Sequence, residues 1–242
     1  MSVPARERSV STDRREFLGA MLAAGLAPAM LDRDGADALS GLPAFRPADS
    51  PPVGDKWDVS WPSRFSGPHR AVFDWFEPNA SAGLWRAAVW KQQVVEAFGV
   101  KPEEVGAVLV IRHRAIPMVM GDEFWARHKL GKVRKIKNPE TGKIAERNPY
   151  RSYASSPKPP PPEQDYSIEN FLKQGGTVLA CGFAIFAMVS LEAKLQGKKS
   201  AEVRPEVLAQ MIPGIILQPS GFFALLEAQR HGCGFFPAEG EG

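Results

Sequence analysis

Two short segments of the sequence are dominated by apolar residues, and they constrain the fold more than any other feature. One is Gly106–His113, which begins Gly-Ala-Val-Leu-Val-Ile, and the other is Thr177–Ala180, which reads Thr-Val-Leu-Ala. Apolar runs of this length, without polar alternation, are typical of strands that are covered on both faces. They predict an α/β domain with a parallel sheet.

The segments around these strands repeat the same alternation of strand and helix. The strand Arg70–Trp75 is followed by a helix from Ala82 to Phe98, whose apolar residues recur at helical spacing, and then by the strand Gly106–His113. This order is a βαβ unit, whose crossover is almost always right-handed. With strands at 215–218 and 233–237, the sequence predicts a mostly parallel sheet of about five strands.

The first 38 residues resemble an export signal rather than a part of the fold. Ser11–Gly19 contains Arg-Arg followed by Phe-Leu, which matches the twin-arginine pattern, and the apolar run Phe17–Leu31 comes next. That run is roughly 22 Å long as a helix, too short for a hydrocarbon core of about 30 Å. We therefore expect a signal peptide over 1–38, the twin-arginine translocase as a partner, a periplasmic or otherwise exported protein, and no stable membrane anchor. An amphipathic N-terminal helix of a cytoplasmic protein is the alternative.

Three further segments lie outside the regular pattern of strands and helices. Residues 39–68 are rich in proline and predict an irregular arm, which Trp57 and Trp61 would pin to the domain. Residues 129–165 form a basic, proline-rich insertion, which is either a solvated loop or a binding segment for an anionic ligand. Residues 238–242 are expected to be a disordered tail.

The composition argues against several classes of function. A net charge of +3 does not indicate a nucleic-acid partner. The four histidines and two cysteines are scattered without metal-ligand spacing, so no metal site is predicted. No glycine-rich phosphate loop follows the first strand, so no cofactor is expected. Cys181 and Cys233 are placed at opposite edges of the sheet, about 15 Å apart, which predicts no disulfide between them.

The carboxyl ends of the predicted strands bring several functional side chains to one edge of the sheet. Ligand sites of open α/β sheets lie just beyond this edge. Trp75, His113, Cys181 and Ser220 all lie at or just after strand ends. Cys181 also precedes an apolar helix that starts near Phe183, and a helix N-terminus favours the thiolate form of a cysteine.

Cationic groups near this thiol would favour the thiolate further. Arg112, His113 and Arg147 are the candidates, and together with Trp75 and Ser220 they form the predicted binding residues around a catalytic Cys181. The structural alternatives are that Cys181 is a small buried apolar residue and that His113 has no chemical role.

The second half of the chain resembles a known family. The residues that carry this resemblance are the strand ending in Cys181, the segment Ile212–Gly221, the helix with Leu225–Gly232, and the closing Gly-Phe-Phe strand. Together they are similar to the DsrE/DsrF-like sulfur-relay proteins, over roughly residues 69–237. The resemblance implies a three-layer flavodoxin-like domain, a trimer or hexamer of identical chains, and a cysteine at the position of Cys181 that accepts and passes on sulfur as a persulfide.

Three functions are consistent with these features. The first is an exported sulfur carrier or thiol protein that uses Cys181. The second is a binding module without enzymatic activity, whose strand-end pocket and basic loop hold a small anionic or sulfur-containing ligand. The third is an oligomeric accessory protein with no catalytic activity, so whether the protein is an enzyme is left open.

Overall fold

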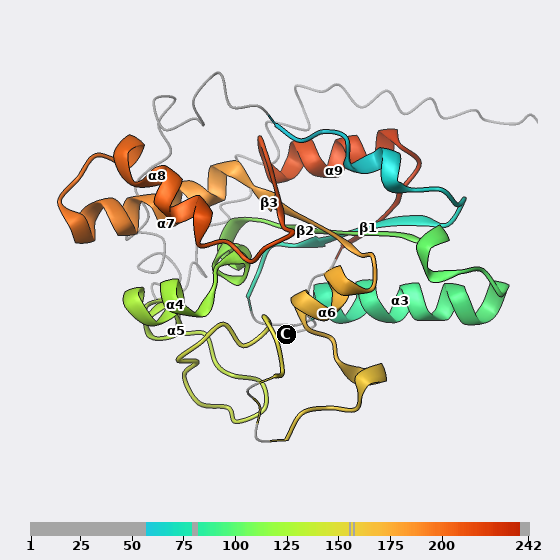
Figure 1. The fold of residues 1–242 in the computed structure, drawn as a ribbon, viewed down its shortest axis with the longest axis horizontal. Helices are drawn as coiled ribbons and strands as arrows, with labels where there is room; N and C mark the ends of the chain where they lie inside the picture. Colours follow the sequence, from blue (N-terminus) through green and yellow to red (C-terminus); the bar gives the residue numbers. More distant parts are fainter. Residues whose placement is uncertain (1–56, 79–81, 155, 157, 238–242) are drawn as a thin grey trace, which may run out of the picture. The chain divides into compact units, whose positions relative to one another are not determined.

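The computed structural model describes residues 57–78, 82–154, 156 and 158–237. The predicted signal peptide 1–38, the first part of the arm 39–68 and the predicted tail 238–242 lie outside the described residues. Figure 1 shows the fold, in which helices lie on both sides of a central sheet.

The sheet has five strands, all of them parallel, in the order β4-β3-β2-β1-β5. This confirms the predicted α/β class and the three-layer flavodoxin-like architecture (Figure 1). The strands are β1 (Arg70–Trp75), β2 (Gly106–Ile111), β3 (Thr177–Cys181), β4 (Ile216–Gln218) and β5 (Gly234–Pro237). The predicted strand Gly106–His113 ends two residues early, because Arg112 and His113 turn into a 3-10 helix.

The apolar runs are explained by cores on both faces of the sheet. Successive side chains of a strand point to opposite faces, so an apolar run covered on both sides supplies two cores at once. The larger core takes Ala107, Leu109 and Ile111 from β2. The smaller core takes Val108 and Val110 from the same strand.

Different segments cover the two faces. The larger core includes residues of α3 (Ala82–Phe98), α6 (Ile168–Lys173) and α7 (Gly182–Gln196). The smaller core is closed by α9 (Gly221–Arg230) together with Trp61 of the 3-10 helix η2 (Trp61–Arg64). In Figure 1, α9 and the cyan η2 segment lie above the sheet, whereas α3 and α6 lie below it.

The helix α8 (Ser200–Ala209) was not predicted from the sequence. It contacts α7 extensively, and Figure 1 shows the two helices running side by side. Only Val203 and Val207 of α8 are buried, and Pro205 lies between them. Two apolar residues one turn apart and an internal proline are a weak helical signal.

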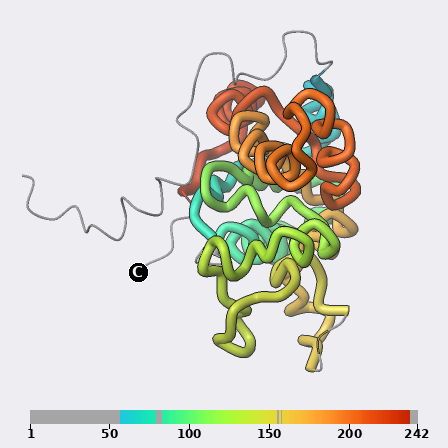
Figure 2. The backbone as a smooth tube through the Cα atoms, turned by 90° about the vertical axis from the view of Figure 1, so that its left-hand side faces the viewer, coloured from blue at the N-terminus to red at the C-terminus, as the bar shows by residue number. Residues whose placement is uncertain are grey.

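The insertion contains short elements that are attached to the domain. The helix α4 (Asp122–His128) leads into the insertion, which itself contains α5 (Leu130–Val133), an isolated bridge between Lys137 and Ile144, and the 3-10 helix η5 (Pro162–Gln164). A Cβ atom on Gly131 would lie 1.8 Å from the carbonyl oxygen of Ala145, so only glycine fits where α5 meets this bridge. Figure 2 shows the yellow-green and yellow insertion on the side of the sheet opposite α9.

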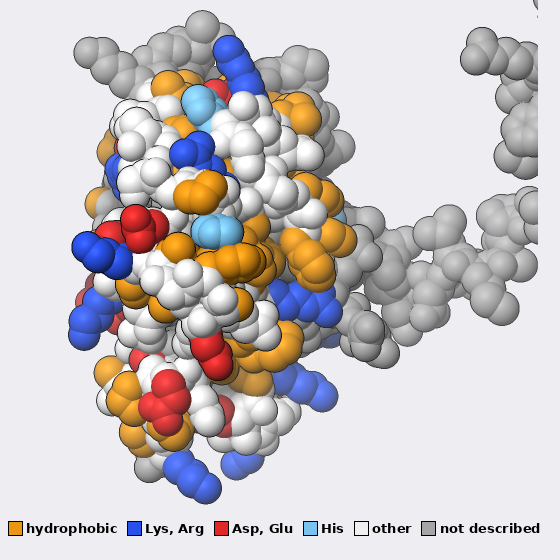
Figure 3. Space-filling view, turned by 90° about the vertical axis from the view of Figure 1, so that its right-hand side faces the viewer, with side chains coloured by type: hydrophobic (Ala, Val, Ile, Leu, Met, Phe, Trp, Pro, Cys, Tyr) orange, Lys and Arg blue, Asp and Glu red, His pale blue; other side chains and the backbone are white. Residues whose placement is uncertain are grey.

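The surface near the end of α3 carries both hydrophobic and charged side chains (Figure 3). α3 ends at Phe98, whose side chain is exposed and stacks on His69 with ring centroids 4.5 Å apart. Figure 3 looks onto the side of Figure 1 where α3 ends, and it shows hydrophobic side chains gathered between charged ones. Among the described residues, no helix combines the length and the apolar character needed to cross a membrane.

The arm is attached to the sheet through Trp61, whose side chain is fully buried. Its indole Nε1 donates a hydrogen bond to Oε1 of Gln218, 3.2 Å away, at the end of β4. Nε2 of the same Gln218 donates to the carbonyl oxygen of Asp58 at 2.7 Å. A buried amide therefore joins two points of the arm to the edge strand.

Replacing Trp61 with phenylalanine tests this attachment. Trp61→Phe keeps an aromatic ring but leaves Oε1 of the buried Gln218 without its donor. We expect the free energy of unfolding to fall by about 1–2 kcal/mol, measured by urea denaturation followed by circular dichroism. Trp85→Phe is the control, because Trp85 is 45% exposed and its replacement should change stability by less than about 0.5 kcal/mol. Equal losses in both variants would contradict the attachment.

Candidate functional site

Three of the predicted site residues lie at the carboxyl edge of the sheet. Cys181 is the last residue of β3 and the N-cap of α7. Arg112 directly follows β2, and its backbone N–H donates to the carbonyl oxygen of Trp75 at 3.0 Å. Ser220 follows β4 as the N-cap of α9, and its hydroxyl accepts a hydrogen bond from the backbone N–H of Phe223 at 3.0 Å.

An ion pair between Arg112 and Asp74 lies at the centre of this edge. The Nε and Nη2 atoms of Arg112 each donate to one carboxylate oxygen of Asp74, both at 2.7 Å. These hydrogen bonds raise the pKa of Arg112 against the opposing effect of burial, and the charge of Asp74 and then Cys181 contribute further. The guanidinium also lies 5.1 Å from the centroid of the Phe76 ring. Asp74 therefore fixes the guanidinium in position near the thiol.

Two glycines allow the helix starts to pack closely around Arg112 and Cys181. A Cβ atom on Gly221 would lie 2.5 Å from Cδ of Arg112, so the first turn of α9 rests directly on that side chain. A Cβ atom on Gly182 would lie 2.6 Å from the carbonyl oxygen of Gln218. The starts of α7 and α9 thus meet at the carboxyl edge of the sheet, and from there the two helices run over opposite faces of the sheet. Such a place is the usual position of a site in open α/β folds.

The Cys181 thiol points back onto its own helix. Its Sγ atom accepts a hydrogen bond from the backbone N–H of Ala184 at 3.4 Å, and the residue is 6% exposed. The Sγ atom therefore lies at the positive end of the α7 dipole, and the Arg112 guanidinium follows the neighbouring strand at the same edge. The arrangement can therefore stabilise a nucleophilic sulfur.

The other cysteine has a different environment. Cys233 precedes β5 and is 5% exposed, and burial raises the pKa of its thiol to about 11, only weakly opposed by the charge of Arg70. It is therefore a protonated thiol near neutral pH. Both cysteines are free in the structure, and the strands β2 and β1 separate β3 from β5.

His113 and Trp75 are turned toward the loop after β1. The His113 side chain is half exposed, and its Nδ1 atom lies 3.7 Å from Oε1 of Glu77. Trp75 is fully buried, donates from Nε1 to the carbonyl oxygen of Glu77 at 2.7 Å, and packs edge-on against Tyr150. A fully buried indole offers no ring face to a ligand, so Trp75 acts in packing.

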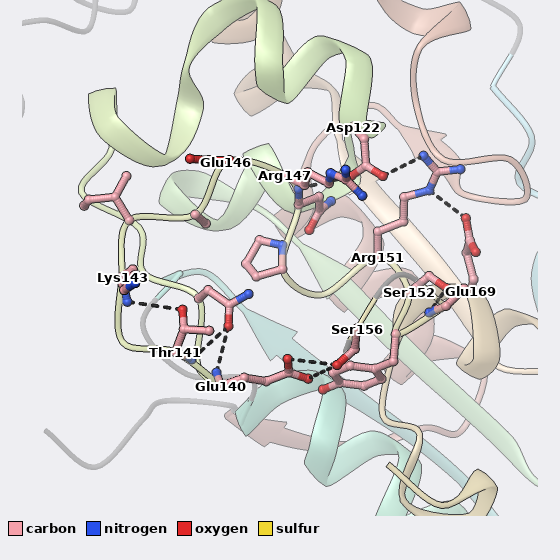
Figure 4. Close-up of a pocket in the computed structure, with 17 residues that line it drawn as sticks. Asp122, Glu140, Thr141, Lys143, Glu146, Arg147, Arg151, Ser152, Ser156 and Glu169 are labelled. Carbon is pink, nitrogen blue, oxygen red and sulfur yellow. Dashed lines mark hydrogen bonds and ion pairs between the residues drawn. The ribbon is translucent and has the colours of Figure 1, made fainter. Parts of the chain in front are cut away.

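Arg147 lies in a separate hollow, formed by the insertion. This open cavity has a volume of about 560 Å³, and Figure 4 shows Arg147 beside it. Arg151 forms part of the cavity lining, with its Nε atom 2.7 Å from Oε1 of Glu169 and its Nη1 atom 3.3 Å from Oδ2 of Asp122. Cys181, Arg112 and Ser220 do not line this cavity. The structure therefore brings Arg112, Cys181 and Ser220 together and places Arg147 elsewhere.

No protein-family model matches the chain, and no curated protein sequence matches it. The site must therefore be interpreted from its own geometry. Within the part of the chain that the structure describes, no cluster of three or more histidine, cysteine, aspartate or glutamate side chains could hold a metal ion.

Asp74 is the site residue that the sequence analysis missed. It is 4% exposed and stands in a strand whose other interior positions are apolar, Arg-Ala-Val-Phe-Asp-Trp. A carboxylate in a strand covered on both faces needs a cationic partner. Arg112, which directly follows the neighbouring strand β2, is that partner.

Proposed function

We propose that the protein is a thiol protein that carries sulfane sulfur on Cys181, as its resemblance to DsrE/DsrF-like proteins suggests. The observation that supports this proposal best is the position of Sγ at the N-terminus of α7, beside the fixed guanidinium of Arg112. The aromatic rings of Phe183 and Phe222, at the starts of α7 and α9, lie 5.7 Å apart, and Phe222 is 60% exposed. An apolar surface therefore adjoins the thiol.

The proposed chemistry balances without a metal or an added oxidant. The Cys181 thiolate attacks a sulfane sulfur of a polysulfide, so that one S–S bond forms and the S–S bond of the donor breaks. The electron pair of the broken bond leaves with the shortened polysulfide anion. A thiolate of an acceptor then attacks the outer sulfur of the Cys181 persulfide and regenerates the Cys181 thiolate. Arg112 would stabilise the anionic sulfur at both stages.

Mass spectrometry after polysulfide treatment tests this function. We expect the protein to gain the mass of one sulfur atom at Cys181, and Cys181→Ser should lose this adduct completely. Cys233→Ser is the matched control, because the raised pKa of that buried thiol makes it a poor nucleophile, and it should keep the adduct. An unmodified Cys181, or an adduct at Cys233 alone, would refute the sulfur-carrier proposal.

Arg112 has less support as part of a small-anion binding site. Its Nε and Nη2 donors are already occupied by the carboxylate of Asp74, whose side chain is 6% exposed. A free anion would have to compete with Asp74 for the same donors. We therefore assign Arg112 to positioning and charge at the thiol.

Export and self-association are further parts of the proposal. The twin-arginine pattern supports a periplasmic location, and cell fractionation of the full chain would test it. The family resemblance suggests a trimer or hexamer, and Leu195 of α7 and Leu226 of α9 are exposed apolar residues that an interface could cover. Light scattering on the purified protein would measure the oligomeric state.

A further inference from the structure

We propose that the cavity formed by the insertion binds a short peptide with free termini, at a site distinct from Cys181. Its volume of about 560 Å³ lies within the range of about 300–1,000 Å³ that is usual for pockets of small organic ligands. All of its lining residues belong to the segment 138–156, except Asp122 and Glu169. The insertion therefore builds a concave surface that the sulfur chemistry of Cys181 does not use.

Hydrogen bonds fix the wall of the cavity that adjoins the domain. Asn148 is 4% exposed, and its Nδ2 atom donates to the carbonyl oxygens of Met118 and Met120, at 2.7 and 2.9 Å. The backbone N–H of Asn148 donates to Oδ1 of Asp122 at 3.2 Å, and Oδ2 of Asp122 lies 3.3 Å from Nη1 of Arg151. Because this wall is already ordered, a ligand loses little binding free energy to ordering it.

A turn forms the opposite wall. Oδ1 of Asn138 accepts hydrogen bonds from the backbone N–H groups of Glu140 and Thr141, at 2.8 and 3.2 Å, and the N–H of Asn138 donates to the carbonyl oxygen of Lys143 at 2.8 Å. Oγ of Ser156 lies 3.3 and 3.1 Å from the two carboxylate oxygens of Glu140, which joins the turn to the returning chain (Figure 4). The cavity thus lies between two walls that the chain holds in place.

The charged side chains of the lining have both signs. Three are basic and four are acidic, and Arg151 is already bound between Asp122 and Glu169. The other four, which together carry no net charge, are Glu140, Lys143, Glu146 and Arg147. Neither a simple anion nor a simple cation is favoured by such a lining, because each meets as many like charges as opposite ones. A ligand that carries one charge of each sign can be attracted at both of its ends.

The positions of these charges indicate how far apart the two charges of the ligand are. Figure 4 shows Arg147 at the upper edge of the cavity, beside Asp122, and Glu140 at the lower edge, beside Ser156. Among the described side chains, no ion pair joins Arg147 to Glu140, and Arg147 has no hydrogen-bond partner. A guanidinium matches the two oxygen atoms of a carboxylate, and a carboxylate attracts an ammonium group. The C-terminus of a short peptide would therefore bind at Arg147 and its N-terminus at Glu140.

The lining between these edges suits the middle of a peptide. Asn138 and Ser152 offer an amide and a hydroxyl to peptide groups. Burial, and then the charges of Glu140 and Asp165, raise the pKa of Tyr153, so its phenol keeps its proton and can donate a hydrogen bond. Ile144, which is 45% exposed, offers apolar surface to a small side chain. These features favour a short peptide over a single amino acid, whose two charges are adjacent.

Calorimetric titration of the full chain with trialanine, without polysulfide, tests the site independently of the proposed sulfur chemistry. We expect saturable binding of the uncapped tripeptide, and a dissociation constant at least about tenfold higher when its N-terminus is acetylated or its C-terminus is amidated. Each cap removes one of the two charges that the cavity is expected to recognise. No saturable binding, or equal affinity for the capped and uncapped peptides, would overturn the proposal.

Two variants at exposed positions assign the ends of the peptide. Arg147→Met and Glu140→Gln should each raise the dissociation constant of trialanine about tenfold. Arg147→Met should not weaken the C-amidated peptide further, and Glu140→Gln should not weaken the N-acetylated one, because the charge that each residue recognises is already absent. Arg230→Met and Glu163→Gln are the matched controls, since both residues are exposed and lie outside the cavity lining, and they should bind trialanine as the unmodified protein does. Equal weakening in the controls, or further weakening of each capped peptide by its corresponding variant, would also overturn the proposal.

Discussion

Asp74→Ala is expected to lower the free energy of unfolding by about 3–5 kcal/mol, measured by urea denaturation near pH 7. The side chain of Asp74 is only 6% exposed, and it accepts both hydrogen bonds that orient the guanidinium of Arg112. Its removal leaves the cation of Arg112 packed against the start of α9 without a counter-charge. Breaking a buried pair by removing one partner is far more costly than the pair is stabilising.

The double variant Asp74→Leu/Arg112→Met separates the cost of an unpaired charge from the loss of the ion pair itself. Replacing both partners with apolar residues of similar volume is often neutral for stability, so we expect the double variant to recover most of the loss. A double variant as unstable as Asp74→Ala would contradict this explanation. The same protein should show slower alkylation of Cys181, because the cation beside the thiol is gone.

The architecture could be predicted from the sequence because the strands carry strong signals. Apolar runs such as Val108–Ile111 supply residues to both cores, so they are unambiguous strands of a covered parallel sheet. Helix α8 was not predicted, because only two of its residues, both valines, are buried. The end of β2 was placed two residues late because the left-handed φ of His113 has no sequence signal in a residue other than glycine.

The candidate site could be predicted only in part. Strand ends in a parallel sheet share one edge, which correctly grouped Arg112, Cys181 and Ser220. The position of Arg147 depends on how the insertion packs, and a segment with little apolar periodicity does not reveal its own packing. Asp74 is recognised only when its burial is known, because polar partners are set by tertiary contacts.

A second buried carboxylate, Glu192, joins α7 to α4. It is 1% exposed, and its two oxygen atoms lie 2.6 Å from Nε2 of His128 and 3.1 Å from Nη1 of Arg127. Nε2 of Gln196 donates a further hydrogen bond at 2.6 Å. One buried side chain of α7 therefore contacts two cationic or titratable side chains of α4.

The network makes stability depend on pH in the acid range. Burial raises the pKa of Glu192, but the hydrogen bonds from Gln196 and His128 and the charge of Arg127 outweigh it, so the pKa of Glu192 lies below its ordinary value. A carboxylate with a depressed pKa in the folded state contributes stability above its unfolded pKa of about 4.3 and loses it as the pH falls through the folded value. Glu192→Gln should therefore flatten the decline of stability below about pH 5.

Glu192→Ala should have the larger effect near neutral pH, a loss of about 3 kcal/mol, because it leaves the buried His128 and the half-buried Arg127 without their acceptor. Glu206→Ala is the matched control: Glu206 contacts the same Arg127 at 3.3 Å but is 45% exposed, so its removal should cost less than about 1 kcal/mol. Urea denaturation of both variants at pH 7 and at about pH 4.5 distinguishes the two carboxylates. The explanation would be contradicted if Glu192→Ala and Glu206→Ala lost the same unfolding free energy at pH 7. It would also be contradicted if the stability of Glu192→Gln fell with acid as steeply as that of the unmodified protein.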